Sequence, residues 1–322
     1  MANLMAKRNW FFALSALIII PGVISLLVFH LRLGIDFTGG ALLRYSFSQP
    51  VQSADIQQVY ASVGIPDVEV QTTIPTQGQQ SAIIRAPNLN ITQIETAENA
   101  LKAKYGSVTR DSADTVGPLI GQQTTRNAVF AVLAASVIIL LYIWWAFRRL
   151  DKPYRYGTCA IIALLHDVLV VVGLWSIFGE VFGFEVDALF VTGVLTVVGF
   201  SVHDTVVVFD RIRENLIKRA GATFETTVNN SLVQTLARSL NTSLTVLMTL
   251  TALLIYGGAS IRIFVLTLLI GITSGTYSSI FNASPLLVVW EYDELGIGRF
   301  LRRFRKRGTT TTRGRTLASD RR

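Results

Sequence analysis

The chain alternates between long apolar runs and shorter polar segments. Runs of about twenty apolar residues are long enough to cross a bilayer as helices. The pattern predicts six membrane-spanning helices, at about 10–30, 127–147, 156–178, 187–209, 238–257 and 262–290. The first run is too long for a secretion signal and lacks a small-x-small cleavage site, so we interpret it as an uncleaved anchor.

One sizeable polar segment, about 36–118, lies between the first two runs and has the periodicity of a folded domain. Alternating apolar positions predict strands, and apolar positions three or four residues apart predict helices. The expected elements are strand 41–47, helix 53–63, strand 67–74, strand 80–86, helix 91–105 and strand 107–114. Ser53 and Asn90 are the expected helix caps. The order βαββαβ is that of a ferredoxin-like domain, for which we expect a binding or mechanical role.

The pattern therefore divides the chain into four parts. Residues 1–35 hold the N-terminus and the first helix, and 36–118 the ferredoxin-like domain. A region of five membrane helices follows at 119–298, and a basic tail at 299–322. Between the fourth and fifth spans, the polar segment 210–237 is expected to form a loop whose apolar face lies along the membrane surface as a helix.

Composition and charge agree with a membrane protein and set its orientation. Only 16% of the residues are charged and 51% are apolar, which is unusual for a soluble protein of 322 residues. Basic residues precede the first span. They also lie between the second and third spans and between the fourth and fifth spans, whereas the only charged residues of loop 179–187 are acidic. By the positive-inside rule both termini are cytoplasmic and 36–118 is outside. The tail accounts for the net charge of +8; we favour contact with anionic lipid over contact with RNA or a ribosome.

Asp204 is the most unusual residue of the apolar runs. A carboxylate in hydrocarbon costs roughly 2.5–3.5 kcal/mol on insertion scales, so it must be paired, hydrated or used. Asp204 precedes Asp210, where charge resumes, by about 9 Å of helix. If the next helix enters the membrane near Leu232, Arg238 lies at a similar depth. The two side chains form either a pair that takes up and releases a proton or a static pair that fixes helix packing.

Other polar side chains form stripes at helical spacing on three consecutive spans. Such stripes indicate a hydrated seam or a tight interface between helices. The stripes are Gly193, Val197, Phe200, Ser201 and Asp204; Arg238, Asn241, Thr242, Thr245 and Thr249; and Thr267, Gly271, Ser274, Ser278 and Asn282. Asn241 and Thr245 are candidate relay members. His166 and Asp167 either extend the same network or form a local pair, and His203 is either a relay member or an interface histidine.

The sequence contains no glycine-rich phosphate loop and no clustered metal-ligand motif, so we expect no cofactor, no metal and no enzymatic activity. Asp167 and Asp204 on neighbouring spans resemble the dyad of an intramembrane aspartyl protease only loosely. Neither carboxylate is preceded by the GxGD pattern, which disfavours that alternative.

Four motifs together resemble the SecD/SecF family of protein-export subunits, within the resistance-nodulation-division superfamily. They are GIDFTGG at 34–40, LLHD at 164–167, GFSVHDTVVVFDRIREN at 199–215 and QTLARSL at 234–240. The resemblance covers nearly the whole chain. It implies a bacterial inner-membrane protein that pairs with SecD beside the SecYEG channel and uses the proton motive force to assist secreted polypeptides.

In that family the Asp of the fourth-span motif and the Arg of the fifth-span motif are linked to proton movement. The resemblance assigns these roles to Asp204 and Arg238. Many members have Asn where this chain has His203. Gly34, Asp36, Gly39 and Gly40 are interpreted as a turn that couples the membrane to the outer domain. The alternatives are a half-size efflux transporter of the same superfamily and a passive scaffold for the translocation channel.

Overall fold

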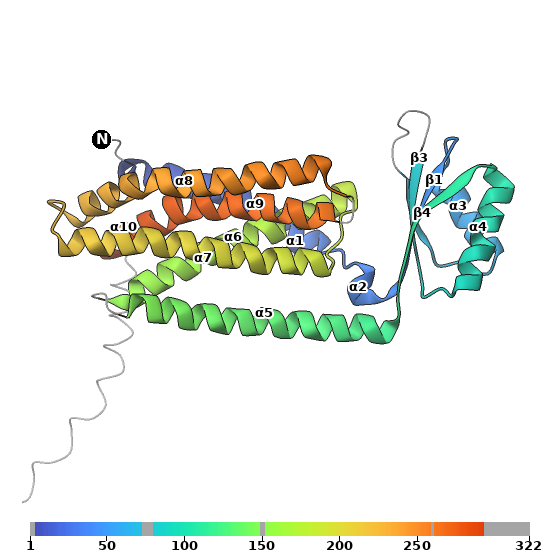
Figure 1. Ribbon diagram of the computed structural model, residues 1–322, viewed down its shortest axis with the longest axis horizontal. Helices are drawn as coiled ribbons and strands as arrows, with labels where there is room; N and C mark the ends of the chain where they lie inside the picture. The colour runs from blue at the N-terminus through green and yellow to red at the C-terminus, as the bar shows by residue number, and fades with distance from the viewer. Residues whose placement is uncertain (1–3, 73–79, 149–151, 259–260, 293–322) are drawn as a thin grey trace, which may run out of the picture.

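A computed structural model describes residues 4–72, 80–148, 152–258 and 261–292. Within these residues, six helices are long and apolar enough to cross a membrane. A bundle of these helices forms one end of the molecule and the small domain forms the other (Figure 1). The membrane helices are α1 (Arg8–Phe29), α5 (Pro118–Phe147), α6 (Pro153–Phe182), α7 (Ala188–Ile217), α8 (Phe224–Tyr256) and α9 (Arg262–Ser278). A π-helical turn, η3 (Ser279–Ala283), joins α9 to α10 (Ser284–Glu291).

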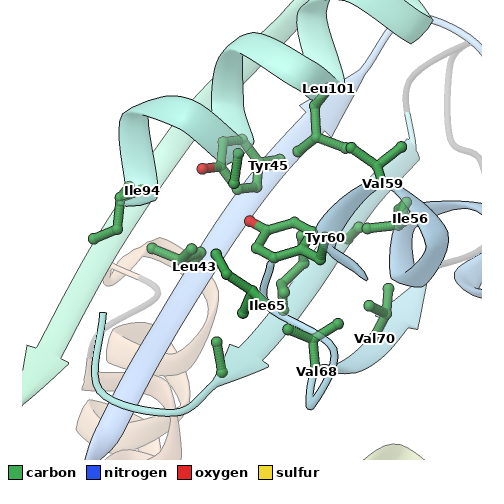
Figure 2. Close-up of a cluster of buried hydrophobic side chains, with 14 of the residues drawn as sticks. Leu43, Tyr45, Ile56, Val59, Tyr60, Ile65, Val68, Val70, Ile94 and Leu101 are labelled. Atoms are coloured by element: carbon green, nitrogen blue, oxygen red, sulfur yellow. The ribbon is translucent and has the colours of Figure 1, made fainter. Parts of the chain in front are cut away.

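The outer domain has the predicted βαββαβ order, which confirms the ferredoxin-like fold. Its elements are β1 (Gly40–Phe47), α3 (Ser53–Ser62), β2 (Glu69–Thr72), β3 (Gln80–Ala86), α4 (Ile91–Tyr105) and β4 (Val108–Val116). The sheet order is β2-β3-β1-β4, with every pair antiparallel. One face of the sheet packs under α3 and α4, where Leu43 and Tyr45 of β1 are buried with Tyr60 of α3 (Figure 2). The opposite, open face is turned toward the membrane helices (Figure 1).

Of the two expected helix caps in the outer domain, Asn90 is confirmed and Ser53 is wrong. Asn90 forms a capping box with Gln93, in which each side chain accepts from the other residue's backbone N–H. Ser53 is instead the first residue of α3, whose N-cap, Gln52, makes no side-chain capping bond. The Ser53 hydroxyl lies 3.5 Å from that of Thr72 on β2.

The expectation of a surface helix within 210–237 is wrong. Helix α7 continues to Ile217 and α8 begins at Phe224, so the polar segment belongs to the ends of two long helices joined by a short turn. The apolar face was real, but it packs inside the protein. Val228 and Leu232 are fully buried beside Ile212 in the core at this end of the bundle. An amphipathic pattern alone does not distinguish a bilayer surface from a neighbouring helix.

Helices α7 and α9 pack at very close range through small residues. Four contacts follow one another, each displaced by four residues along both helices, so the two helices run parallel in one register. The contacts are Gly193 with Thr267, Val197 with Gly271, Ser201 with Gly275 and, at the first residue of η3, Thr205 with Ser279. Small side chains at every fourth position allow the two backbones to approach. The stripes on these two spans therefore form a tight interface.

We predict that Gly271→Ala loosens this interface. A Cβ atom at Gly271 would lie 2.1 Å from Val197 Cγ2, and the stiff valine side chain cannot give way. We expect a loss of about 1–3 kcal/mol of stability, measured by thermal unfolding in detergent. The matched control is Gly199→Ala on α7, where no atom lies within 4 Å of the added methyl group. Equal stability of the two variants would contradict the proposed contact.

Candidate functional site

Asp204 is buried in the middle part of α7. Only 4% of the residue is exposed, and its Oδ2 atom is buried without a hydrogen-bond partner among the described residues. A charged carboxylate in that position is costly unless something compensates it. Asp204 is therefore a buried carboxyl group with one oxygen that no described residue contacts by a hydrogen bond.

Arg238 lies at the level of Asp204 but does not contact it. Asp204 is thirteen residues before the end of α7 at Ile217, and Arg238 is fourteen residues after the start of α8 at Phe224. The two residues thus lie at a similar level of the α7–α8 hairpin, and α8 begins eight residues before Leu232. Arg238 is exposed and lines a cleft of about 560 Å³ between α5, α7 and α8. No ion pair joins the two side chains among the described residues, so the expected pair is not formed in this conformation.

Asp167 on α6 is the best-satisfied polar group of the bundle. The residue has no exposed surface, and its carboxylate accepts from three serine hydroxyls. The donors are Ser201 of α7 at 2.5 Å, and Ser274 and Ser278 of α9, both at 2.7 Å. We call these four residues the Asp167 cluster. It ties three helices together at one buried carboxyl group, which supports a structural role for Asp167 over that of a relay member.

The remaining candidate relay residues lie on three different helices, α6, α7 and α8. His166 Nδ1 lies 3.0 Å from Asp167 Oδ1, while its Nε2 atom is buried and has no hydrogen-bond partner in the described part of the chain. His203 is exposed on α7. Asn241 and Thr245 are exposed on α8, and the Thr245 hydroxyl donates to the Asn241 carbonyl at 2.8 Å. These residues do not form one continuous chain of hydrogen bonds.

The polar stripe of α8 faces out of the protein. All five of its residues, Arg238, Asn241, Thr242, Thr245 and Thr249, are exposed. Its threonine hydroxyls donate to backbone carbonyls four residues earlier. An exposed polar face on a membrane helix is costly in lipid and marks a surface that meets water or a partner.

The GIDFTGG segment (34–40) forms the joint between the bundle and the outer domain. Residues Ile35–Thr38 form the short helix α2. The Gly34 N–H donates to the Val186 carbonyl at 2.8 Å, and the Ala188 N–H donates to Asp36 at 2.9 Å. Asp36 therefore places a carboxylate at the N-terminus of α7, where the helix dipole favours it.

The same N-terminus holds a second carboxylate, Asp187, whose side chain accepts from the Phe190 N–H at 2.6 Å. Burial raises the pKa of the Asp187 carboxyl, and the nearby Asp36 adds to that rise.

The two adjacent glycines of the segment meet a steric requirement. Gly39 and Gly40 have positive φ angles of 72° and 121°, which side-chain-bearing residues rarely adopt. A Cβ atom on Gly40 would lie 2.7 Å from the Ala86 carbonyl oxygen. On the other side, Gly121 of α5 packs against the Gly39 N atom. The segment thus contacts α5, α7 and the sheet at once.

Within the described residues, no group of three or more His, Cys, Asp or Glu side chains is placed to hold a metal ion. The features that stand out are two buried carboxyl groups in the membrane helices, an exposed polar stripe and a tightly built joint. Together they define a multi-pass membrane protein whose helices carry a small ferredoxin-like domain.

Comparison with known proteins places the chain within one family. Residues 96–293 match the family described as "Protein export membrane protein SecD/SecF, C-terminal", and residues 24–51 match the "SecD/SecF GG Motif". The chain belongs to the SecD/SecF family of protein export membrane proteins. Membership supports a role in protein export.

Similar proteins include single subunits and fused chains. The chain is 50% identical to the protein translocase subunit SecF of Thermobaculum terrenum, over 95% of this chain and 98% of that one. It is 37% identical to the subunit SecDF of Bacillus subtilis, over 90% of this chain and 38% of that one. The crystal structure of SecDF from Thermus thermophilus superimposes with a TM-score of 0.77 at 32% identity, over 90% of this chain and 39% of that one. The chain thus spans about two fifths of the fused proteins, which supports an association with SecD.

We predict that Asp167→Ala destabilises the bundle strongly. The change removes the acceptor of three buried hydroxyls, and each unsatisfied buried group costs about 1–3 kcal/mol. Asp167→Asn keeps the shape and one acceptor oxygen, so its loss should be smaller. Thermal unfolding in detergent measures both, with Asp114→Asn on the exposed strand β4 as the control. If Asp167→Ala unfolds like the control, the cluster does not hold the helices together.

Proposed function

We propose that this chain is a proton-coupled subunit that works with SecD beside the SecYEG channel and assists secreted polypeptides after they emerge. It acts as a transport motor and not as an enzyme. The observation that carries the proposal is the Asp204 carboxyl, which is buried in a membrane helix with one oxygen unpartnered among the described residues. A proton on this group removes the charge whose burial is costly.

In the proposed cycle, Asp204 alternates between a protonated form and an ionised form that attracts Arg238. The two residues lie at the same level of one helix hairpin, so the ionised carboxylate and the guanidinium can meet through a local shift of α7 against α8. Protonation weakens the attraction and lets Arg238 return to the cleft at the surface. Proton binding must therefore shift the equilibrium between two conformations, one with Arg238 at Asp204 and one with Arg238 in the cleft.

The proposed orientation has both termini in the cytoplasm and the outer domain on the outside of a bacterial inner membrane. The start of α1, the α7–α8 turn and α10 share the end of the bundle opposite the outer domain (Figure 1). Basic side chains gather there, including Arg8, which pairs with Glu225, and Arg155, which pairs with Glu291. This asymmetry follows the positive-inside rule. The basic tail at 299–322, proposed to touch anionic lipid, lies outside the described residues.

A passive scaffold is the second candidate. It is favoured by the lack of an ion pair to Arg238 among the described residues and by the three hydrogen bonds of the Asp167 cluster. In that case Asp204 is a static buried group and the exposed α8 stripe only binds the partner subunit. Assembly alone would then sustain export, whatever the charge at Asp204.

We predict that Asp204→Asn and Arg238→Met each abolish proton movement and reduce secretion. Asparagine is neutral at every pH and cannot exchange a proton, and methionine cannot attract the carboxylate. Proton flux is measured in vesicles holding this chain with SecD, and secretion in cells, after co-purification shows that the variants assemble. We expect flux at the level of protein-free vesicles.

The matched control for this experiment is Asp210→Asn. Asp210 lies on the same helix and pairs with Arg213 at 2.9 Å, but its side chain is 61% exposed. Removing that charge should leave flux and secretion unchanged. Near-normal flux and secretion in both Asp204→Asn and Arg238→Met would contradict the proton-carrier proposal and favour the scaffold.

A further inference from the structure

The outer domain is joined to the membrane helices by only two crossings of the chain. One passes through Gly39 and Gly40 into β1, and the other runs from the end of β4 through Gly117 into α5. The first two have positive φ, and no atom lies within 4 Å of a Cβ built on Gly117. Glycine links restrict the backbone little. Side-chain contacts therefore add to the close packing of Gly39 against Gly121 in fixing the orientation of the domain in this conformation.

A chain of four alternating charges provides such contacts. Glu69 of β2 and Arg85 of β3 are directly opposite one another in the sheet, with Arg85 Nη1 3.2 Å from Glu69 Oε2. From the membrane side, Arg32 Nη2 lies 3.3 Å from Glu69 Oε1, and Glu185 pairs with Arg85 Nε. We call Arg32, Glu69, Arg85 and Glu185 the clamp.

The Arg85–Glu185 pair is the enclosed part of the clamp. The side chains of Arg85 and Glu185 are 17% and 12% exposed, against 40% and 51% for Arg32 and Glu69. Beside it, Gln71 of β2 rests on Gly183, where any Cβ would lie 2.4 Å from the Gln71 amide oxygen. The outer sheet therefore fits closely onto the loop between α6 and α7.

The same loop leads directly into α7, which begins at Ala188. Val186 pairs with the chain leaving α1, through N–H donation to the Arg32 carbonyl at 2.7 Å and an isolated parallel bridge to Leu33. Asp187, the next residue, caps α7. The clamp thus connects the outer domain to the N-terminus of the helix that carries Asp204.

We propose that the clamp is a releasable latch between the outer domain and the membrane helices. When it is formed, the open face of the sheet is held on the 183–187 loop. When it opens, the domain pivots about Gly39, Gly40 and Gly117. The Arg32–Glu69 contact suits release, because a partly exposed ion pair is individually weak and is screened by salt. Two acidic and two basic groups also leave no net charge in the closed state.

The test measures the position of the outer domain directly. Spin labels are placed on the exposed residues Thr92 of α4 and Glu180 of α6, in the full chain with SecD in lipid nanodiscs. The buried Cys159 is replaced by Ser so that it does not react. We expect one dominant distance for the unaltered clamp. Raising the salt concentration should broaden the distribution.

Charge reversal separates the latch from general damage to the fold. Arg85→Glu and Glu185→Arg should each lower the docked fraction by about threefold to tenfold, and the double variant should restore much of it. Arg85→Lys should have an intermediate effect, because lysine keeps the charge but not the planar fork that reaches two carboxylates.

The matched control is Arg110→Glu. Arg110 pairs with Glu98 at 3.1 Å inside the outer domain, so its reversal should leave the docked fraction unchanged. The proposal is overturned if Arg85→Glu leaves the distances as they are. It is also overturned if the double variant resists proteolysis like the original but shows no recovery of docking. Neither outcome depends on proton flux, so the latch and the proton-coupling proposal fail separately.

Discussion

The contact between α7 and α9 organises the membrane part of this protein. Its helices approach through Gly193, Gly271 and Gly275, and the Asp167 carboxylate of α6 closes the contact by accepting from serines on both helices. Lipid offers no hydrophobic driving force between helices, so packing and buried hydrogen bonds must supply the stability. A fully satisfied buried carboxylate also specifies the helix register, because a slip would leave it unpaired.

That register has consequences at both ends of α7. Ser201, which donates to Asp167, precedes Asp204 by less than one helical turn, so the Asp167 cluster fixes the height of Asp204 in the bundle. At the outer end, Asp36 and Asp187 cap the same helix. One rigid element therefore connects the buried carboxyl with the joint of the outer domain. A helix transmits a displacement along its axis because its own hydrogen bonds resist stretching.

The sequence predicts the helices and strands of this protein better than it predicts the contacts between their side chains. Six spans and the βαββαβ order follow from periodicity, and Asn90 follows from its capping pattern. The end of α7 at Ile217 and the start of α8 at Phe224 do not follow from periodicity. Polar residues that pack against other polar residues have the same sequence pattern as a solvent-exposed loop. The serines of α7 and α9 were visible as stripes, but only the fold shows that three of them meet Asp167. The clamp was not predicted at all, since Arg85 and Glu185 are one hundred residues apart in ordinary polar positions.

Asp204 and Arg238 do not form an ion pair in this conformation, and their surroundings differ. Asp204 is enclosed by its own helices, whereas Arg238 stands on the surface with the polar stripe of α8. A guanidinium facing hydrocarbon is costly, so in the membrane this face must be covered by water or by another polar helix surface. This chain spans about two fifths of the fused SecDF relatives, which supports an association with SecD. Completing the α8 surface with a partner would therefore set where Arg238 rests, and with it how readily an ionised Asp204 could draw it inward.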